Sequence, residues 1–275
     1  MGRKKKRARE KAEAESQKVA EQGPEGNAEK KDKKGKTEGT RKERDFRQWA
    51  LGWVKSIALA LVLWFVIQAF LVKSYRIDSG SMEATLYEND FLFINKAVYG
   101  AKVPFTGLRT PKFRDPHRGE LIVLRGIELD SLTIVKRVIG IGGDTLEMRS
   151  DSLFRNGQYV DEPYAKLIDP MVEMPPMQRQ IARRWQLPQL VDGTANAEYL
   201  PGLRNWGPFV VPDDHLFAMG DNRDASHDGR AWGFLPRSHL IGHPLFIYYS
   251  YDPNSWSPLR FITAIRWGRL LRSPG

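Results

Sequence analysis

Two short segments of this 275-residue chain carry residue types that could perform acyl transfer. The first is Ser79-Gly80-Ser81-Met82, in which a glycine with free backbone conformation separates two hydroxyl groups. Such a turn could direct the Ser81 amide N–H and the Ser79 hydroxyl at one point, as in an oxyanion hole. The second is Ile134-Val135-Lys136-Arg137, which places a lysine in an apolar stretch. A serine and a lysine can act together as nucleophile and general base.

Lys136 can serve as a base only if its amine is uncharged near neutral pH. A free lysine has a pKa of about 10.4, which is too high for that purpose. The residues around Lys136 would cover the amine with apolar atoms, and burial lowers a lysine pKa by about 2–3 units in favourable cases. These neighbours are Leu132, Ile134, Val135, Val138 and Ile139. The commoner explanations remain structural, because a serine beside glycine is usually a turn residue and a lysine in a strand is usually solvated.

A third polar segment, Met219 to Arg230, could support such a site. It imitates the start of a calcium loop, but its twelfth position is Leu235 where such a loop needs glutamate. Two interpretations remain: a turn that makes its own hydrogen bonds, or a support in which a hydroxyl orients the lysine while Asp228 pairs with Arg230.

No cofactor or metal is expected. Residues 140–143 lack the spacing of a phosphate-binding glycine loop, and cysteine is absent, which excludes disulfides and thiolate metal sites. The histidines show no zinc-ligand pattern, so we assign them structural or surface roles. They are His117, His215, His227, His239 and His243.

The run from Trp49 to Val72 is apolar on every face and predicts a transmembrane helix. A bilayer core needs about 20 helical residues, and this run supplies them. An apolar surface on every face favours a membrane span over a buried core helix. A cleaved signal peptide would have a shorter leader, a shorter apolar stretch and a small-residue cleavage site. We therefore predict a signal-anchor over residues 49–72 that leaves the N-terminus in the cytoplasm, since basic residues precede it.

Both ends of the chain are basic and contribute to a net charge of +10. Residues 1–48 contain few apolar groups, which predicts a disordered cytoplasmic tail. Residues 252–275 mix arginines with aromatic and aliphatic residues, so they predict either an amphipathic segment on anionic lipid or a solvated tail. No nucleic-acid recognition motif accompanies the charge, and we expect no nucleic-acid binding.

Residues 73–251 predict one extracytoplasmic domain of mainly β class with antiparallel sheets. Short apolar runs separated by Gly, Pro and Asp are typical of strands. The runs are 90–94, 121–124, 132–141, 209–211, 216–219 and 244–251. Residues from about 150 to 205 predict an inserted, β-rich second lobe, with a helical patch from Met177 to Trp185 in the Pro-rich part from Lys166 to Leu203.

Four blocks, in this order, closely resemble the bacterial type I signal peptidases, also called leader peptidases, which are serine–lysine proteases. The blocks read SGSMEATL, DFLFINKAVYG, LTIVKRVIGIGGDTLE and MGDNRDASHDGRAWGFLPRSHLIG. The resemblance covers the apolar run and most of residues 75–251. Two departures are visible: Ala84 stands where the family commonly has proline, which suggests a less rigid turn, and Asn89 replaces a usual glycine.

The resemblance implies a role for each matching residue. Ser81 would be the nucleophile and Lys136 the general base, while Ser79 would help the Ser81 amide bind the oxyanion. Ser226 would orient the lysine, and Asp228 and Arg230 would form a structural ion pair. Shallow pockets for small side chains would be formed by Ile77, Leu86, Ile134 and Val135.

The resemblance also implies a membrane-anchored endopeptidase that removes signal peptides from exported preproteins after an Ala-x-Ala type site. Its expected location is the bacterial cytoplasmic (inner) membrane, as a single-pass protein. The expected partners are signal peptides, membrane lipid and the secretion translocon. Two alternatives remain open: a non-enzymatic membrane-anchored binding module, and a self-cleaving serine–lysine peptidase of related fold.

Overall fold

The computed structural model describes residues 47–274, except 105, 129–130, 168 and 192–197. The predicted disordered tail at 1–48 therefore lies almost entirely outside the described residues. The chain divides into two units, Met1–Trp64 and Phe65–Gly275. A helix from Arg47 to Leu71 has a mean hydropathy of 2.2 and is long and apolar enough to cross a membrane. It is a candidate membrane span by length and composition.

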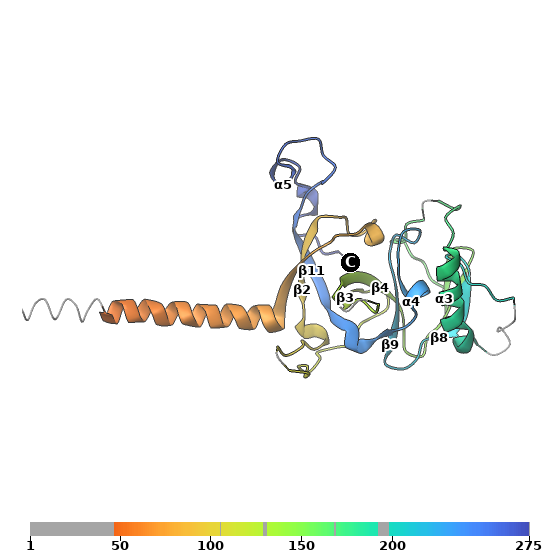
Figure 1. The fold of residues 1–275 in the computed structure, drawn as a ribbon, viewed down its shortest axis with the longest axis horizontal. Helices are drawn as coiled ribbons and strands as arrows, with labels where there is room; N and C mark the ends of the chain where they lie inside the picture. The colour runs from red at the N-terminus through yellow and green to blue at the C-terminus, as the bar shows by residue number, and fades with distance from the viewer. Residues whose placement is uncertain (1–46, 105, 129–130, 168, 192–197, 275) are drawn as a thin grey trace, which may run out of the picture. The chain divides into compact units, whose positions relative to one another are not determined.

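The second unit is built mostly from short strands joined by 3-10 and α-helical turns (Figure 1). Its strands are β1 (Val72–Arg76), β2 (Asp90–Asn95), β3 (Leu121–Arg125), β4 (Thr133–Ile141), β5 (Thr145–Arg149), β6 (Ser152–Arg155), β7 (Gln158–Tyr159), β8 (Trp206–Val210), β9 (His215–Met219), β10 (Leu235–Pro236) and β11 (Leu240–Ser250). Its helices and helical turns are η1 (Ile67–Leu71), η2 (Gly80–Met82), η3 (Ala97–Tyr99), α3 (Pro176–Gln186), η4 (Leu187–Gln189), α4 (Gly229–Trp232), η5 (Arg237–His239), α5 (Arg260–Thr263) and η6 (Trp267–Arg269).

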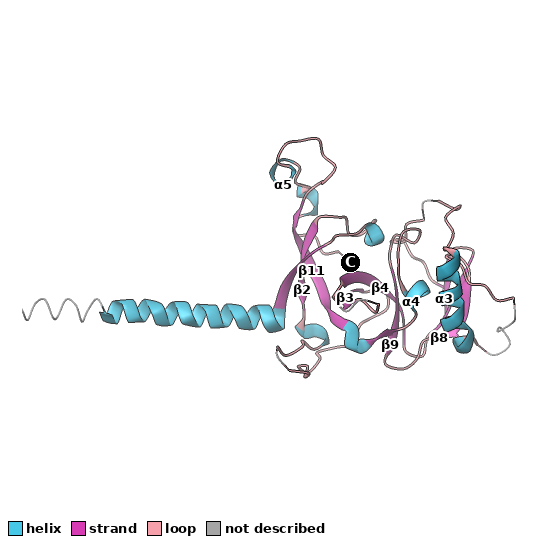
Figure 2. Cartoon of the chain, in the orientation of Figure 1, coloured by secondary structure: helices cyan, strands magenta, loops and turns pink. Residues whose placement is uncertain are grey.

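Two antiparallel sheets carry the domain (Figure 2). The larger has seven strands in the order β1-β2-β11-β3-β4-β9-β10, and the smaller has four in the order β7-β6-β5-β8. Strand partners are antiparallel throughout both sheets. The predicted mainly β, antiparallel class is therefore confirmed. Each strand predicted from an apolar run is present, with β11 beginning four residues earlier than the expected start at Pro244.

The smaller sheet and α3 form the inserted lobe. It spans Thr145 to Val210, so its strands begin before and end after the predicted range of about 150–205. The predicted helix Met177–Trp185 is present as α3, which begins at Pro176, a residue favoured in the first turn because its missing N–H would be unpaired there. Trp185 packs edge-to-face on Phe209 with ring centroids 5.2 Å apart, which holds α3 against β8.

The centre of the larger sheet is covered on both faces, and this decides where the side chains of β4 lie. Alternate residues of β3 enter different hydrophobic clusters: Leu121 and Val123 join one, and Ile122 and Leu124 join another. Side chains alternate along β4 in the same way. Lys136 therefore shares its face with Ile134 and Val138, which pack in the cluster of Ile122.

Part of the C-terminal segment, which the sequence predicted as an amphipathic segment or a solvated tail, packs on the domain. The segment contains α5 (Arg260–Thr263) and the 3-10 turn η6 (Trp267–Arg269), and its backbone returns along β11. The Arg266 amide donates to the Ser250 carbonyl at 2.9 Å, and the Leu271 amide donates to Ile247 at 2.7 Å. The physical reason is a buried carboxylate, Asp90, that pairs with Arg269. Arg269 is thus not free to face lipid, although Trp267 keeps 71% of its surface exposed.

Candidate active site

Ser81 lies on a loop that joins β1 to β2 and that we call the nucleophile loop (residues 77–90). The Ile77 amide donates to the Asp90 carbonyl at 2.8 Å, and the Asn89 amide donates to the Ile77 carbonyl at 2.9 Å, so the base of the loop is closed. Ser81 is part of the 3-10 turn η2 and is nearly buried. The loop therefore holds the Ser81 hydroxyl in a fixed place beside the larger sheet.

Two residues on this loop adopt positive φ angles. Asn89 has φ +65°, in the left-handed region that glycine and asparagine enter most readily, which explains an asparagine where the similar family usually has glycine. Ala84 has φ +116°, whereas proline fixes φ near about −65°. The sequence suggested only a less rigid turn at Ala84, but the backbone there has a shape that proline cannot adopt.

The Lys136 amine reaches Ser81, 55 residues earlier in the sequence, with 2.7 Å between Nζ and Oγ. Lys136 is only 3% exposed. Burial lowers its pKa to about 8, against the pull of the Asp228 and Asp221 carboxylates and with the help of Arg230. A substantial fraction of the amine is therefore neutral near physiological pH, and a neutral amine can accept the Oγ proton.

The Ser79 hydroxyl stands close to the same point. Its Oγ lies 3.4 Å from the Oγ of Ser81. Ser79 has extended backbone angles immediately before η2. A hydroxyl beside the reacting oxygen can donate a hydrogen bond to the charge that develops on a carbonyl oxygen.

The polar segment Met219–Arg230, which the sequence predicted as a support, contacts the nucleophile loop through hydrogen bonds. The Asn222 amide donates to the Ser81 carbonyl at 3.1 Å, and the Asn222 side-chain amide donates to the Gly80 carbonyl at 3.1 Å. Gly220 allows this approach: a Cβ at that position would lie 2.4 Å from the Ser81 carbonyl oxygen and 2.2 Å from Ser226 Oγ. Only glycine fits there without movement of the loop.

Asp228 and Arg230 form a buried ion pair, in the arrangement that the resemblance implied. The Arg230 Nη2 donates to Asp228 Oδ2 at 2.8 Å, and its Nε donates to Oδ1 at 2.9 Å. Asp228 also accepts the Gly220 amide at 3.0 Å. Burial by itself raises the pKa of Asp228, but Arg230 and these hydrogen bonds lower it to about 2. The pair therefore stays ionised and fixes the backbone at Gly220.

Ser226 does not make the contact expected of it. Its Oγ is buried and has no hydrogen-bond partner among the described residues, and the hydrogen bond of the Lys136 amine goes to Ser81. The Ser226 side chain instead lies against Gly220. Its hydroxyl is therefore unpaired beside the site rather than engaged with the lysine.

A cavity of about 340 Å³ opens beside the serine and the lysine. Its lining consists of Ser79, Gly80, Ser81, Gly126, Ile127, Glu128, Leu132, Ile134, Lys136, Ala225, His227 and Trp232. Of the four residues expected to contact substrate, Ile134 is present. Leu86 is fully buried, and Ile77 and Val135 pack with it in a core cluster, because strand alternation turns Val135 away from the face of Lys136.

The cavity contains residues that the sequence did not single out for this purpose. Ile127 and Trp232 supply apolar walls, and Trp232 follows the Asp228–Arg230 pair in α4. His227, which we had assigned a structural or surface role, lines the cavity with Glu128, and its Nε2 lies 3.2 Å from the Glu128 carboxylate. No sequence spacing linked residues 127–128 to this site, because they lie in a connection between β3 and β4.

The family model and the curated relatives that match this chain agree on one family. The family described as Signal peptidase, peptidase S26, matches residues 50–249. Signal peptidase I S of Bacillus subtilis is 31% identical over 79% of this chain and 96% of its own length. Signal peptidase I of Pseudomonas aeruginosa is 31% identical over 73% of each chain. A crystal structure of a signal peptidase I from Enterococcus faecalis is 26% identical, with a TM-score of 0.31, and covers 47% of this chain and 97% of that one.

Proposed function

The chain belongs to the signal peptidase I family, peptidase S26, and on that premise we propose that Ser81 is its nucleophile and Lys136 its general base. Membership makes the protein a serine peptidase that acts on preproteins. The observation that carries the assignment of residues is the buried Lys136 amine 2.7 Å from the Ser81 hydroxyl. The alternative of a non-enzymatic binding module has no support once the chain belongs to a peptidase family.

In the first half of the reaction, the neutral Lys136 amine accepts the Ser81 Oγ proton as Oγ attacks the scissile carbonyl carbon. The carbonyl oxygen becomes an oxyanion, which the Ser81 amide and the Ser79 hydroxyl stabilise. The resulting Lys136 ammonium then gives its proton to the leaving amine as the C–N bond breaks. An acyl-enzyme on Ser81 Oγ and a free new N-terminus result.

In the second half, water replaces the leaving peptide. Lys136, neutral again, accepts a proton from this water as the water attacks the acyl carbon. The bond between the acyl carbon and Ser81 Oγ then breaks, the Lys136 ammonium returns its proton to Oγ, and the signal peptide leaves with a free carboxylate. The buried Ser226 hydroxyl, which has no partner among the described residues, is available to orient the amine during these steps. Asp228 and Arg230 act indirectly, by holding Gly220 against the nucleophile loop.

The apolar part of the cavity lining, together with membership of the family, supports cleavage after small uncharged residues of the Ala-x-Ala type. The cavity measures about 340 Å³, and Ile134, Leu132 and Trp232 supply apolar side chains to its wall. Apolar walls favour uncharged side chains over charged ones. The preference for small side chains is what membership of the family implies. Ile134 is the member of the expected substrate-binding set that this argument retains.

The candidate span Arg47–Leu71 supports a single-pass anchor in the bacterial cytoplasmic (inner) membrane, with the N-terminus in the cytoplasm. Few residues separate the end of this helix from Ser81, so the site must work near lipid. A preprotein still held by its apolar signal peptide would then meet the enzyme at high effective concentration. The same geometry favours work beside the secretion translocon.

Cleavage of a defined precursor tests this function. We expect the full chain in detergent or vesicles to cut a precursor with an Ala-x-Ala site once, and Edman sequencing to place the new N-terminus directly after the second alanine. The same precursor with aspartate in place of that alanine should stay intact. Cleavage at unrelated sites, or equal cleavage of both precursors, would contradict the assignment.

The pH dependence of the reaction follows from the pKa of Lys136, which burial lowers to about 8. Below that pH the amine is protonated and cannot accept a proton, so kcat/KM should fall as pH decreases through about 8. Above it the rate should reach a plateau. Initial rates with a peptide substrate over this range measure the midpoint. A midpoint typical of an ordinary histidine, or of an exposed lysine, would speak against Lys136 as the base.

A further inference from the structure

The C-terminal segment (residues 260–274) lies beyond residue 249, where the family match ends, yet it contacts the nucleophile loop directly. It is held in place by backbone hydrogen bonds from Arg266 to Ser250 and between Leu271 and Ile247. Two of its arginines then reach residues 85–90 of the nucleophile loop. The C-terminal segment is thus part of the structure that surrounds Ser81.

Arg269 makes the strongest of these contacts. Its Nη2 and Nε donate to the two oxygens of the Asp90 carboxylate at 2.5 and 3.0 Å, in the bidentate geometry that gives arginine both energy and direction. Asp90 is fully buried at the base of the loop and also accepts the Tyr87 amide at 2.8 Å and the Ser250 hydroxyl at 2.7 Å. Asp90 therefore connects the end of the nucleophile loop both to Arg269 of the C-terminal segment and to Ser250 of β11.

The same guanidinium also reaches the middle of the loop. Arg269 Nη2 donates to the Thr85 carbonyl at 2.9 Å, and Arg266 Nη1 donates to the Glu88 carbonyl at 3.0 Å. Arg269 stacks over the ring of Tyr87 at 4.4 Å from its centroid. One side chain thus holds the loop at a carbonyl, a ring and a carboxylate.

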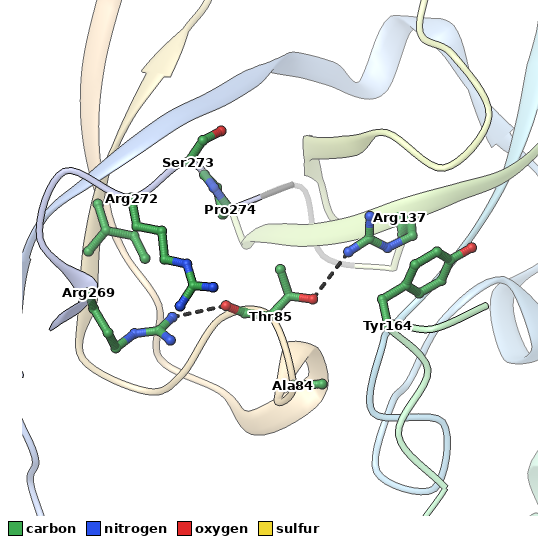
Figure 3. Close-up of a pocket in the computed structure, with 9 residues that line it drawn as sticks. Ala84, Thr85, Arg137, Tyr164, Arg269, Arg272, Ser273 and Pro274 are labelled. Atoms are coloured by element: carbon green, nitrogen blue, oxygen red, sulfur yellow. Dashed lines mark hydrogen bonds between the residues drawn. The ribbon is translucent and has the colours of Figure 1, made fainter.

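Thr85 is the point where the C-terminal segment meets the strand that carries the lysine (Figure 3). Its hydroxyl donates to Asp221 at 2.6 Å and accepts from Arg137 at 3.2 Å, while its carbonyl faces Arg269. Arg137 and Asp221 form a buried ion pair, and Arg137 directly follows Lys136 in β4. A cavity of about 440 Å³ opens beside Thr85, so hydrogen bonds rather than dense packing set its position.

We propose that Arg269 is a positioning residue for the reaction: it holds the nucleophile loop so that Ser81 Oγ stays within reach of the Lys136 amine. The proposal rests on the proposed function of Ser81 and Lys136. Thr85 follows Ser81 by four residues, and the Leu86 amide bonds to the Met82 carbonyl at 2.8 Å, so a shift at Thr85 is transmitted to the turn at Ser81. A displacement of about 1 Å at the reacting atoms can cost about 100-fold in rate.

The test uses the full chain with Arg269→Gln, Arg269→Lys and a matched control, Arg272→Gln. Arg272 belongs to the same segment and its side chain is exposed. Active sites are titrated with an acylating inhibitor, and kcat and KM are measured per titrated site well below the unfolding temperature. We expect kcat to fall by about 10- to 100-fold in Arg269→Gln with KM unchanged. Arg269→Lys should recover part of the loss, because lysine keeps the positive charge but cannot donate to both Asp90 oxygens as the planar guanidinium does. Arg272→Gln should have the same kcat and KM as the unmodified protein.

A purely structural role predicts a different pattern. Arg269→Gln would then lower the melting temperature or the number of titratable sites and leave kcat per site unchanged, and that result would overturn the proposal. A change in KM alone would also overturn it. If the glutamine variant does not fold, Arg269→Lys carries the test, and an unchanged kcat per site in that variant is decisive against it. Failure of the underlying function would be seen separately, as cleavage that persists in Ser81→Ala.

Discussion

Replacing Lys136 with methionine should reduce kcat by at least about 1,000-fold and leave the protein folded. The substitution removes the amine that lies 2.7 Å from Ser81 Oγ and can accept its proton. Ser81→Ala should cost as much, and the double variant should be no slower than either single one, because the two residues act as a unit. Single-turnover cleavage of a signal-peptide substrate measures the loss. The enzyme concentration is taken from the mass of folded protein, because these variants cannot be titrated at the active site.

The free energy of unfolding of Lys136→Met distinguishes loss of the base from loss of the fold. Because burial lowers the Lys136 pKa, the unfolded chain binds a proton more readily between about pH 8 and the ordinary lysine value, and stability increases with pH in that window. Lys136→Met removes this penalty, so its free energy of unfolding at neutral pH should rise rather than fall. Lys102→Met, at an exposed lysine, serves as the matched control and should change neither quantity. Cleavage at more than a tenth of the normal rate in Lys136→Met would refute the assignment of the base.

The second large effect is expected at the buried ion pair. Asp228→Ala should lower the free energy of unfolding by about 3–5 kcal/mol, because it leaves the Arg230 guanidinium buried without its carboxylate. Arg230 and Asp228 are both almost completely buried, and the Gly220 amide would lose its acceptor as well. Denaturant unfolding in detergent measures the change. Glu173→Ala, at a carboxylate whose side chain is 77% exposed and pairs only at the surface with Arg179, should cost little.

The ion pair between Asp228 and Arg230 also predicts how the free energy of unfolding changes with pH. Asp228 has a pKa of about 2 in the folded protein, below its value in an unfolded chain. It therefore contributes stability at neutral pH, and that contribution is lost as pH falls from the unfolded value toward about 2. The difference in stability between the unmodified protein and Asp228→Ala should narrow over that range. A difference that is small at neutral pH, or that does not change on acidification, would contradict the role of this pair.

The sequence predicted α3 and the strands with long apolar runs, namely β2, β3, β4, β8, β9 and β11, because each has a strong local signal. The short or mixed strands β1, β5, β6, β7 and β10 lack that signal and were not predicted. The apolar runs of β3 and β4 are bounded by glycine, proline and acidic residues, and the Met177–Trp185 patch follows two prolines. The prediction that Ser81 lies near Lys136 depended on the four blocks and their order in the similar family. The two residues are 55 positions apart, and local patterns do not encode a contact over that separation. The resemblance implied Leu86 and Val135 as pocket residues, and in the structure both pack in a core cluster, a distinction that their apolar character does not reveal.

The C-terminal segment escaped prediction for a different reason. Alternating arginines and aromatic residues look the same whether they lie on lipid or fold back on a domain. The deciding partner of Arg269 is Asp90, a single buried carboxylate 179 positions earlier, and the sequence gives no local sign of that pairing. The apolar lining at Ile127 and Trp232 is similar, since it forms only when the β3–β4 connection meets α4 at the cavity.

The most direct measurement is the site and rate of covalent labelling by an acylating inhibitor, mapped by peptide mass spectrometry. The unmodified protein should gain one adduct on Ser81, with a labelling rate that increases as pH rises through about 8. Ser81→Ala should gain none there, and Lys136→Met should label far more slowly. An adduct on another residue, or labelling of Ser81 at an equal rate with and without the Lys136 amine, would contradict the pairing of these two residues.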